Sequence, residues 1–271
     1  MNRTELLPDR PGIPPMAKLP DPEVVDPAGL AQAYARGETD LIVVLGPTAS
    51  GKTRYAVQLA REISATAGLP AEILSADSRQ VYRGMDIGTG KDLREYGEVP
   101  YHLIDIVPAG TRYNIYQYQA AFADAWADVR HRGTVPILCG GSGLYIEAAT
   151  RAYKFDKGNG LPPENLPRQP YYIGTLVSRE ERVARIDRRL EERLQEGLVE
   201  EVRTLLATVP APDLLYYGLE YKFVTQYVLG DIPYEDMVVG LGNAIHQFAK
   251  RQMTWFRGME RDGIRIHWVR P

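Results

Sequence analysis

The strongest chemical signal in the chain is the segment Gly46–Thr53, which reads GPTASGKT. It fits the pattern G-x-x-x-x-G-K-[ST] and lies between an apolar run, residues 40–45, and a segment of helical spacing, residues 55–67. Glycines let successive backbone N–H groups point at one anion, and the helix N-terminus adds the positive end of its dipole. Lys52 supplies a positive charge to phosphate oxygens, and the Thr53 hydroxyl is a ligand for Mg²⁺. The segment predicts a pyrophosphate site, whether the pyrophosphate belongs to ATP or to another donor.

A second polar group follows the next apolar run, residues 71–75, and begins with Asp77. Because ligands of parallel α/β sheets bind at the carboxyl ends of strands, we expect it beside the phosphate site. The Asp77 carboxylate can hold an amine or a ribose edge and accept its proton, with Ser78 and Gln80 close by. The alternative interpretation is that Asp77 only caps a turn with Ser78.

Two later segments carry further candidates. Gly140–Tyr145 follows another apolar run, where small residues allow a base or a phosphate to approach and Ser142 can donate a hydrogen bond. In the last helical segment His246, Lys250 and Arg257 recur at spacings of four and seven, so they share one helical face. This face can clamp phosphates. The opposing interpretation is a core helix, packed through Phe248, Met253 and Trp255, with its charges in water; both hold for different faces. Arg251 and Trp255 form a further pair four residues apart.

The elements that must position these residues alternate between strands and helices. Strands are predicted at 40–45, 71–75, 101–107 and 135–139, with helices at 55–67 and 115–130. This order is typical of an α/β fold with a parallel sheet flanked by helices and right-handed crossovers. After it we expect a strand at 171–177, a charged helix at 178–206, helices at 220–229 and 234–257, and a strand at 265–269.

Four regions follow from this pattern. Residues 1–38, rich in proline and acids, are expected to be a flexible tail with one short helix near 30–36. Residues 39–150 form the α/β core. Residues 151–170, crowded with Gly, Pro and Asn, form a linker. Residues 171–271 complete the core with a strand and a helical C-terminal part.

Composition narrows the classes of protein. Hydrophobic residues make up 44% and charged residues 25%, the balance of a soluble globular chain. No apolar run is long enough to span a membrane, and a signal-peptide pattern is absent, so we expect a cytoplasmic protein, and a monomer. The single cysteine, Cys139, excludes an internal disulfide and a Cys-rich zinc site. A net charge of −3 does not indicate a nucleic-acid binder, although residues 250–270 carry six Lys or Arg against two acids.

Seven segments, in this order, resemble those of the tRNA dimethylallyltransferases, also called tRNA isopentenyltransferases or the IPP transferase family. They read GPTASGKT, ADSRQVYRGMDIGTGK, YHLIDI, YNIYQYQ, PILCGGSGLYIEA, GLVEEV and AKRQMTWFRG. The resemblance runs from about residue 40 to the end, except for the linker. It implies a P-loop NTPase-like fold. It also implies transfer of dimethylallyl from dimethylallyl diphosphate to N6 of the adenosine 3′ of the anticodon in tRNA, with Mg²⁺.

The resemblance also implies residue roles. Asp77 matches the general base, acting with Lys52, Thr53 and Ser142, and Thr53 is the Mg²⁺ ligand. Ser142 stands where the family usually has Thr. His246 stands where many members have a diphosphate-binding Arg, which puts that role in doubt. The residues implied to bind the donor diphosphate are Gly46, Thr48, Ala49, Ser50, Gly51, Lys52, Thr53 and His246. Those implied to contact adenosine or the anticodon arm are Asp77, Ser78, Arg79, Gln80, Ser142, Lys250, Arg251 and Arg257.

One departure keeps other functions open. Residues 151–170 are too short and too rich in Pro and Gly to form the helical insert with which bacterial members grip the anticodon arm. A first alternative is therefore an adenylate isopentenyltransferase acting on free nucleotides. A second is a P-loop kinase or NTPase, although the sequence has no Arg-rich lid segment. A third is a truncated chain with impaired affinity for tRNA, or a non-catalytic RNA-binding descendant.

Overall fold

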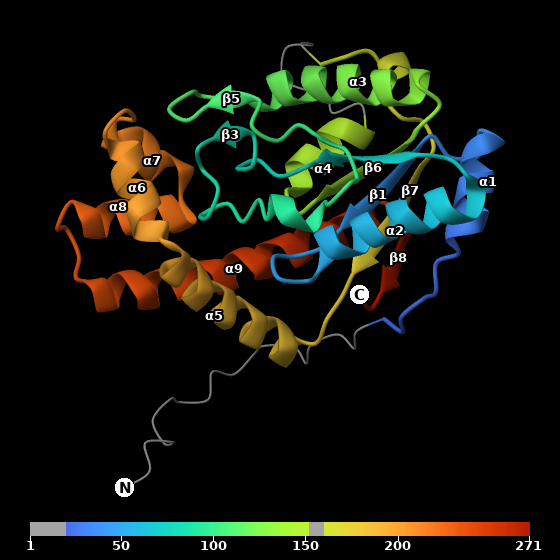
Figure 1. The fold of residues 1–271 in the computed structure, drawn as a ribbon. Coiled ribbons are helices and arrows are strands. Elements are labelled where there is room, and N and C mark those ends of the chain that lie inside the picture. The colour runs from blue at the N-terminus through green and yellow to red at the C-terminus, as the bar shows by residue number, and fades with distance from the viewer. Residues whose placement is uncertain (1–19, 152–159) are drawn as a thin grey trace, which may run out of the picture.

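The central sheet of the computed structural model, which describes residues 20–151 and 160–271, has six strands in the order β4-β2-β6-β1-β7-β8 (Figure 1). All neighbouring strands are parallel, as the alternating pattern predicts. The strands are β1 (Leu41–Leu45), β2 (Ala71–Ser75), β4 (Tyr101–His102), β6 (Val135–Gly140), β7 (Pro170–Thr175) and β8 (Ile266–Val269). A small second sheet pairs β3 (Tyr82–Arg83) with β5 (Val107–Pro108).

Helices cover both faces of this sheet. Along the fully buried β1, Ile42 and Val44 pack into one apolar cluster with α1 (Pro27–Ala35) and α2 (Lys52–Ala67). The alternate residues of β1 join a larger cluster. It lies with α3 (Ile115–His131), α4 (Gly143–Thr150) and the long α9 (Tyr234–Arg261). The sheet is thus the middle of three layers.

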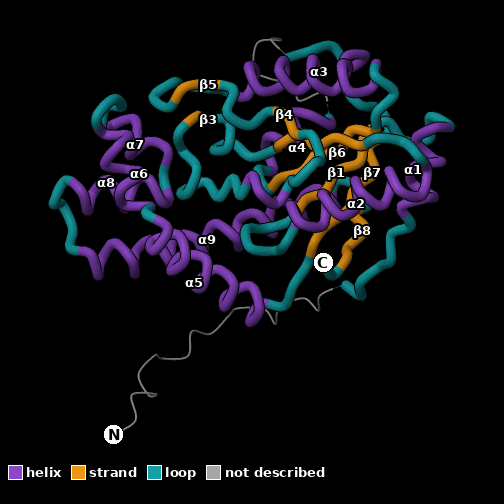
Figure 2. Tube along the Cα trace, viewed as in Figure 1, coloured by secondary structure: helices purple, strands orange, loops and turns teal. Residues whose placement is uncertain are grey.

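The C-terminal half adds four helices that extend the molecule away from α1, seen at the left of Figure 2. They are α5 (Arg179–Glu196), α6 (Leu198–Leu206), α7 (Ala211–Tyr217) and α8 (Leu219–Val228). The prediction of one continuous helix over 178–206 is wrong, because Gly197 adopts φ 104° and ends α5. Short 3₁₀ helices occur at η1 (Leu93–Glu95) and η2 (Pro163–Asn165).

Two further predictions differ from the structure. The predicted strand 101–107 pairs with the central sheet only at its first two residues, because Leu103 and Asp105 have positive φ angles of 66° and 56° and turn the chain. Residues 20–38 are not a flexible tail, since α1 buries Leu30 and the Tyr34 hydroxyl donates to the Thr134 carbonyl at 2.9 Å. The remainder of the predicted tail, and residues 152–159 of the predicted linker, lie outside the described residues.

None of the helices within residues 20–151 and 160–271 combines the length and apolar character needed to cross a membrane.

Candidate active site

Three adjacent strand ends converge on one site. The P-loop follows β1, Asp77 follows β2, and Ser142 follows β6, and these three strands are neighbours in the order β2-β6-β1. The last two loops are joined directly, because the Ser142 backbone N–H donates to the Ala76 carbonyl at 3.2 Å. The parallel sheet therefore brings together the residues that the sequence marked separately.

The P-loop has the tight backbone that its sequence predicts. Ala49 and Gly51 have φ angles of 60° and 83°, and α2 begins directly afterwards at Lys52. Gly46 is required by close packing, because a Cβ there would lie 2.2 Å from Thr175 Oγ1. The Ser50 hydroxyl is buried and hydrogen-bonded to Thr175 Oγ1 at 2.7 Å, so Ser50 can offer a phosphate only its backbone.

A cavity of about 1160 Å³ opens over the P-loop. It is lined by Ala49, Gly51, Lys52 and Thr53 of the P-loop and the start of α2. Residues of α5 line it as well: the arginines Arg185, Arg188, Arg189 and Arg193, and the glutamates Glu192 and Glu196. These arginines recur at helical spacing and so lie on one face of α5. The sequence analysis described α5 only as charged and found no Arg-rich segment. That statement is wrong, because four arginines of α5 line the cavity over the P-loop, and their helical spacing was the available signal.

Asp77 and its neighbours form the other half of the site. One carboxylate oxygen of Asp77 accepts a hydrogen bond from the Arg79 backbone N–H at 2.9 Å. The Asp77 carboxylate therefore does cap a turn, although the N–H that it accepts from belongs to Arg79 and not to Ser78. Ser142 Oγ accepts from the Ser78 backbone N–H at 3.0 Å and lies 3.3 Å from its hydroxyl. Ser142 thus fixes the loop that carries Asp77.

Comparison with known proteins agrees with this geometry. A model of the family described as IPP transferase matches residues 80–166 and 155–259. The curated tRNA dimethylallyltransferase 1 of Parabacteroides distasonis is 45% identical, with 85% of this chain and 92% of its own length aligned. The chain belongs to the IPP transferase family. The resemblance seen in the seven sequence segments is thereby confirmed.

Other members of the family agree. tRNA dimethylallyltransferase 2 of Porphyromonas gingivalis is 45% identical over 84% of this chain and 93% of its own. The crystal structure of the tRNA delta(2)-isopentenylpyrophosphate transferase of Staphylococcus epidermidis superposes with a TM-score of 0.71 at 28% identity, covering 85% of this chain and 92% of that one. The predicted fold, a parallel sheet flanked by helices with a helical C-terminal part, is confirmed.

The Parabacteroides relative carries residues within the aligned span that this chain lacks. The alignment with the Parabacteroides protein spans 288 residues, whereas 85% of this 271-residue chain is about 230, so about 58 aligned positions have no residue here. The family model matches in two parts that overlap at residues 155–166.

Positive charge is concentrated in the P-loop half of the site. Burial lowers the pKa of Lys52, and the nearby positive charges of Arg189 and Arg193 lower it further, against the opposing pull of Asp77. Arg193 donates to Glu220 at 3.0 Å, and desolvation lowers the pKa of this guanidinium while raising that of the Glu220 carboxyl. An added phosphate would relieve this crowding of positive charge.

A partly buried carboxylate shapes the loop that carries residues 86–88. Glu201 on α6 accepts hydrogen bonds from the backbone N–H groups of Asp86, Ile87 and Gly88 at 2.9, 2.7 and 3.1 Å, and from the Tyr221 hydroxyl at 2.7 Å. Across the same loop, buried Lys91 donates to the Tyr82 carbonyl at 2.7 Å, to Asp86 at 2.6 Å and to Asp105. The sequence analysis assigned no role to Glu201 or Lys91.

Gln80 differs from its expected role. Its side-chain oxygen accepts from Ser75 Oγ at 3.1 Å and its amide nitrogen donates to the Gly90 carbonyl at 3.3 Å. Gln80 is buried, and these two bonds make it a support of the loop; its predicted contact with adenosine stays a prediction.

Helix α9 contributes one residue that the sequence analysis missed. Gln252 accepts from the Thr48 backbone N–H at 2.8 Å and donates to the Gly141 carbonyl at 2.9 Å, and thus joins the P-loop to the loop after β6. Trp255 packs against Gly143, where a Cβ would lie 2.3 Å from the indole ring. A buried Gln on an otherwise apolar helix face was the available signal.

The charged residues predicted on α9 do not line the cavity over the P-loop. His246 is hydrogen-bonded to Asp187 of α5 at 2.8 Å and is not among the residues that line the cavity. Lys250, Arg251 and Arg257 are exposed. The Arg251 guanidinium lies 5.9 Å from the ring centre of Phe248, three residues earlier in α9, whereas the predicted partner was Trp255.

A metal site made by the protein alone is absent from the described ranges, which hold no group of three or more His, Cys, Asp or Glu suited to a metal. The Thr53 hydroxyl lies beside the cavity, and Asp86 and Asp92 line it as well. Mg²⁺ commonly keeps several waters and binds through one or two protein ligands together with substrate phosphates. Thr53, Asp86 and Asp92 therefore fit a Mg²⁺ ion that binds together with a diphosphate.

Proposed function

We propose that this protein transfers a dimethylallyl group from dimethylallyl diphosphate to N6 of the adenosine 3′ of the anticodon in tRNA, releasing diphosphate. The observation that carries the proposal is the placement of a phosphate-binding loop and Asp77 at neighbouring strand ends. Membership of the IPP transferase family, with relatives named for this activity, supports it. The two halves of the site would hold the two substrates.

The donor half binds the diphosphate. Backbone N–H groups of the P-loop, Lys52 and the arginines of α5 surround the space over the start of α2. Negative charge accumulates on the diphosphate as the carbon–oxygen bond breaks, so these groups stabilise the transition state more than the ground state. Thr53, with the phosphate oxygens, would hold Mg²⁺, which neutralises part of the leaving-group charge.

The acceptor half activates the amine. The exocyclic nitrogen of adenine is a weak nucleophile, because its lone pair is delocalised into the ring. Asp77 accepts a proton from N6 as the new nitrogen–carbon bond forms, which leaves the product amine neutral. The bond from Arg79 N–H to one oxygen of Asp77 fixes the orientation of the carboxylate. Ser142 supports this loop through Ser78.

Exposed cations of α9 are suited to RNA. Lys250, Arg251 and Arg257 contact phosphates in this proposal, which positions the RNA without reading its sequence. We assign His246 a different role from the one expected: its bond to Asp187 holds α5 against α9 and so supports the cavity-lining arginines of α5.

The short segment at 151–170 favours one alternative. If the residues that the relatives carry in addition form their RNA-gripping insert, this chain has less surface for an anticodon arm, which suits a free adenine nucleotide as acceptor. A P-loop kinase or NTPase is the third candidate.

The experiment supplies radiolabelled dimethylallyl diphosphate and Mg²⁺ with unmodified tRNA bearing the target adenosine and, in parallel, with AMP. Label in tRNA is the expected result. Label in AMP alone would replace the tRNA reaction by nucleotide prenylation. ATP hydrolysis with no prenyl transfer to either acceptor would overturn the proposal in favour of an NTPase.

A further inference from the structure

An exposed tyrosine paired with an arginine lies on α7. The side chain of Tyr216 is 65% exposed, although α7 otherwise buries its large residues Leu214 and Tyr217. The Arg112 guanidinium lies over the Tyr216 ring, 5.6 Å from its centre, and the Arg112 side chain is 79% exposed. Arg112 comes from the loop between β5 and α3, about 100 positions earlier in the sequence.

Buried contacts hold the two partners in place. The Tyr217 hydroxyl accepts from the Gly110 backbone N–H at 2.7 Å and donates to the Thr111 carbonyl at 3.2 Å. Arg112 itself lies 3.8 Å from Asp213 on α7. The loop that carries Arg112 is therefore fixed to the helix that carries Tyr216, so the exposed pair is formed in advance of any ligand.

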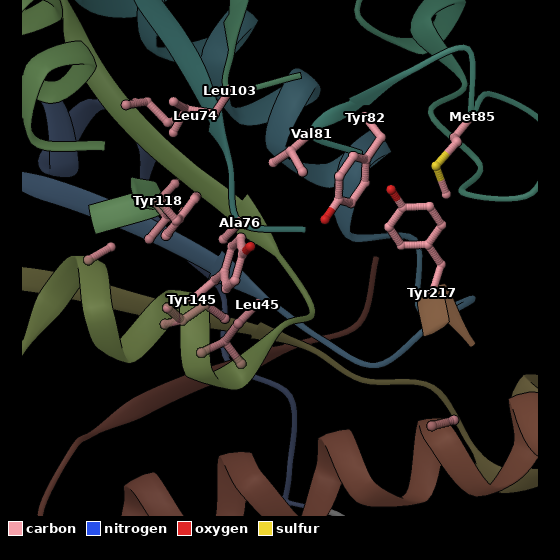
Figure 3. Close-up of a cluster of buried hydrophobic side chains, with 14 of the residues drawn as sticks. Leu45, Leu74, Ala76, Val81, Tyr82, Met85, Leu103, Tyr118, Tyr145 and Tyr217 are labelled. Atoms are coloured by element: carbon pink, nitrogen blue, oxygen red, sulfur yellow. The ribbon is translucent and has the colours of Figure 1, made fainter. Parts of the chain in front are cut away.

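The pair is connected to the acceptor half of the site. The ring centres of Tyr216 and Tyr217 are 6.4 Å apart, and the Arg79 guanidinium lies 5.8 Å from the centre of the Tyr217 ring. Arg79 is the residue whose backbone N–H binds Asp77. Figure 3 shows Tyr217 facing Tyr82, and their ring centres are 4.5 Å apart.

We infer that Tyr216 and Arg112 form a stacking platform for an unpaired nucleobase adjacent to the target adenosine in RNA. This inference rests on the proposed function and adds a contact that a free nucleotide does not make. Unpaired bases stack on tyrosine rings and on guanidinium planes, and every base offers such a face. The exposed positive charge of Arg112 also suits the phosphate that links that base to its neighbour.

The test measures binding of an unmodified anticodon stem-loop by fluorescence anisotropy, together with prenyl transfer to the stem-loop and to AMP. Tyr216→Ala should weaken stem-loop binding about tenfold or more, the usual size of a lost base stack, while Tyr216→Phe retains it. Any transfer to AMP should be the same in both variants. Tyr234→Ala is the matched control, because Tyr234 is also an exposed tyrosine beside another aromatic ring, Tyr227.

A stem-loop with an abasic nucleotide next to the target adenosine identifies the contact. Two such RNAs are tested, one abasic on each side of the target adenosine. On one of them Tyr216→Ala should weaken binding by at most about twofold, because the base that stacks on Tyr216 is already missing. An unchanged cost on both abasic RNAs would overturn the platform, as would equal losses in Tyr216→Ala and Tyr234→Ala. If the wild-type protein transfers label to AMP and binds no stem-loop, the proposed tRNA reaction is wrong. That outcome differs from failure of the platform alone, in which the wild-type protein still binds the stem-loop.

Discussion

The donor half and the acceptor half of the site are built differently. The donor half starts from eight consecutive residues, Gly46–Thr53, whose backbone conformation is set locally by small residues and by the start of α2. The acceptor half is joined from β2, β6 and α7, through hydrogen bonds between residues more than 60 positions apart. A phosphate can be bound by backbone geometry that a short motif encodes, whereas an amine and its base need side chains placed by the whole fold.

The largest effect should come from Asp77→Asn. The amide keeps the oxygen that accepts from Arg79 N–H but cannot take up the N6 proton, so transfer should fall about 10²- to 10⁴-fold. Donor binding should change by less than about twofold, because the P-loop is untouched. Single-turnover transfer and equilibrium donor binding measure the two halves separately. Equal losses in both would show that Asp77 also serves donor binding.

A smaller effect, about 10- to 100-fold on donor affinity, is expected for Arg185→Ala, because a charge-assisted phosphate contact is lost. Arg185 lines the cavity, and its guanidinium nitrogen is 3.6 Å from the position of a Cβ on Gly51. Arg203→Ala is the control. Each arginine pairs with a glutamate on its own helix, at 2.5 Å for Arg185 and 3.4 Å for Arg203, but Arg203 does not line the cavity. Isothermal titration with a non-reactive donor analogue should separate the two variants; similar affinities would remove α5 from the donor half.

Donor binding should also weaken as the pH rises into the alkaline range. Burial holds the pKa of Lys52 below its ordinary value of 10.5, and the diphosphate binds the protonated amine. Affinity is therefore full below the folded pKa and falls as the pH passes through it, by at most about tenfold per pH unit. Lys52→Arg keeps its charge and should lose this alkaline decrease, as measured by donor titrations between pH 7 and pH 10. A decrease of equal size in the variant would assign it to another group.

The smallest effect on catalysis, but a measurable one on stability, is expected for Glu201→Gln. The amide can replace only part of a carboxylate that accepts three backbone N–H bonds and one from Tyr221. The free energy of unfolding should fall by about 1–3 kcal/mol, measured by urea denaturation. Glu200→Gln, on the exposed side of the same helix, should stay within about 0.5 kcal/mol. If the two variants are equally stable, the loop over residues 86–88 does not depend on this carboxylate.

The sequence predicted the elements whose pattern is local and continuous. The apolar run of β1 and the helical spacing of α2 and α3 depend on neighbours within one or two turns, and their positions agree with the structure. The predicted strand at 101–107 was wrong because Leu103 and Asp105 adopt left-handed backbone conformations, which could not be predicted from their residue types.

Site residues divide in the same way. Lys52, Thr53, Asp77 and Ser142 could be named from motifs, and the fold brings their loops together. The cavity-lining arginines of α5, the carboxylate of Glu201 and the amide of Gln252 could not be placed, because each acts on a segment about 100 or more positions away. The sequence showed only a stripe of cationic residues in α5 and a polar residue, Gln252, on an apolar face of α9.

Gln252 has a further consequence for how the two substrates bind. Its amide bonds to one loop of each half of the site, at Thr48 and at Gly141, so loss of motion in either loop restricts the other. The substrate that arrives first bears the entropic cost of ordering both loops, and the second meets a site already arranged. We therefore expect donor and acceptor to raise each other's affinity by the same factor, as linkage requires, with no change of fold.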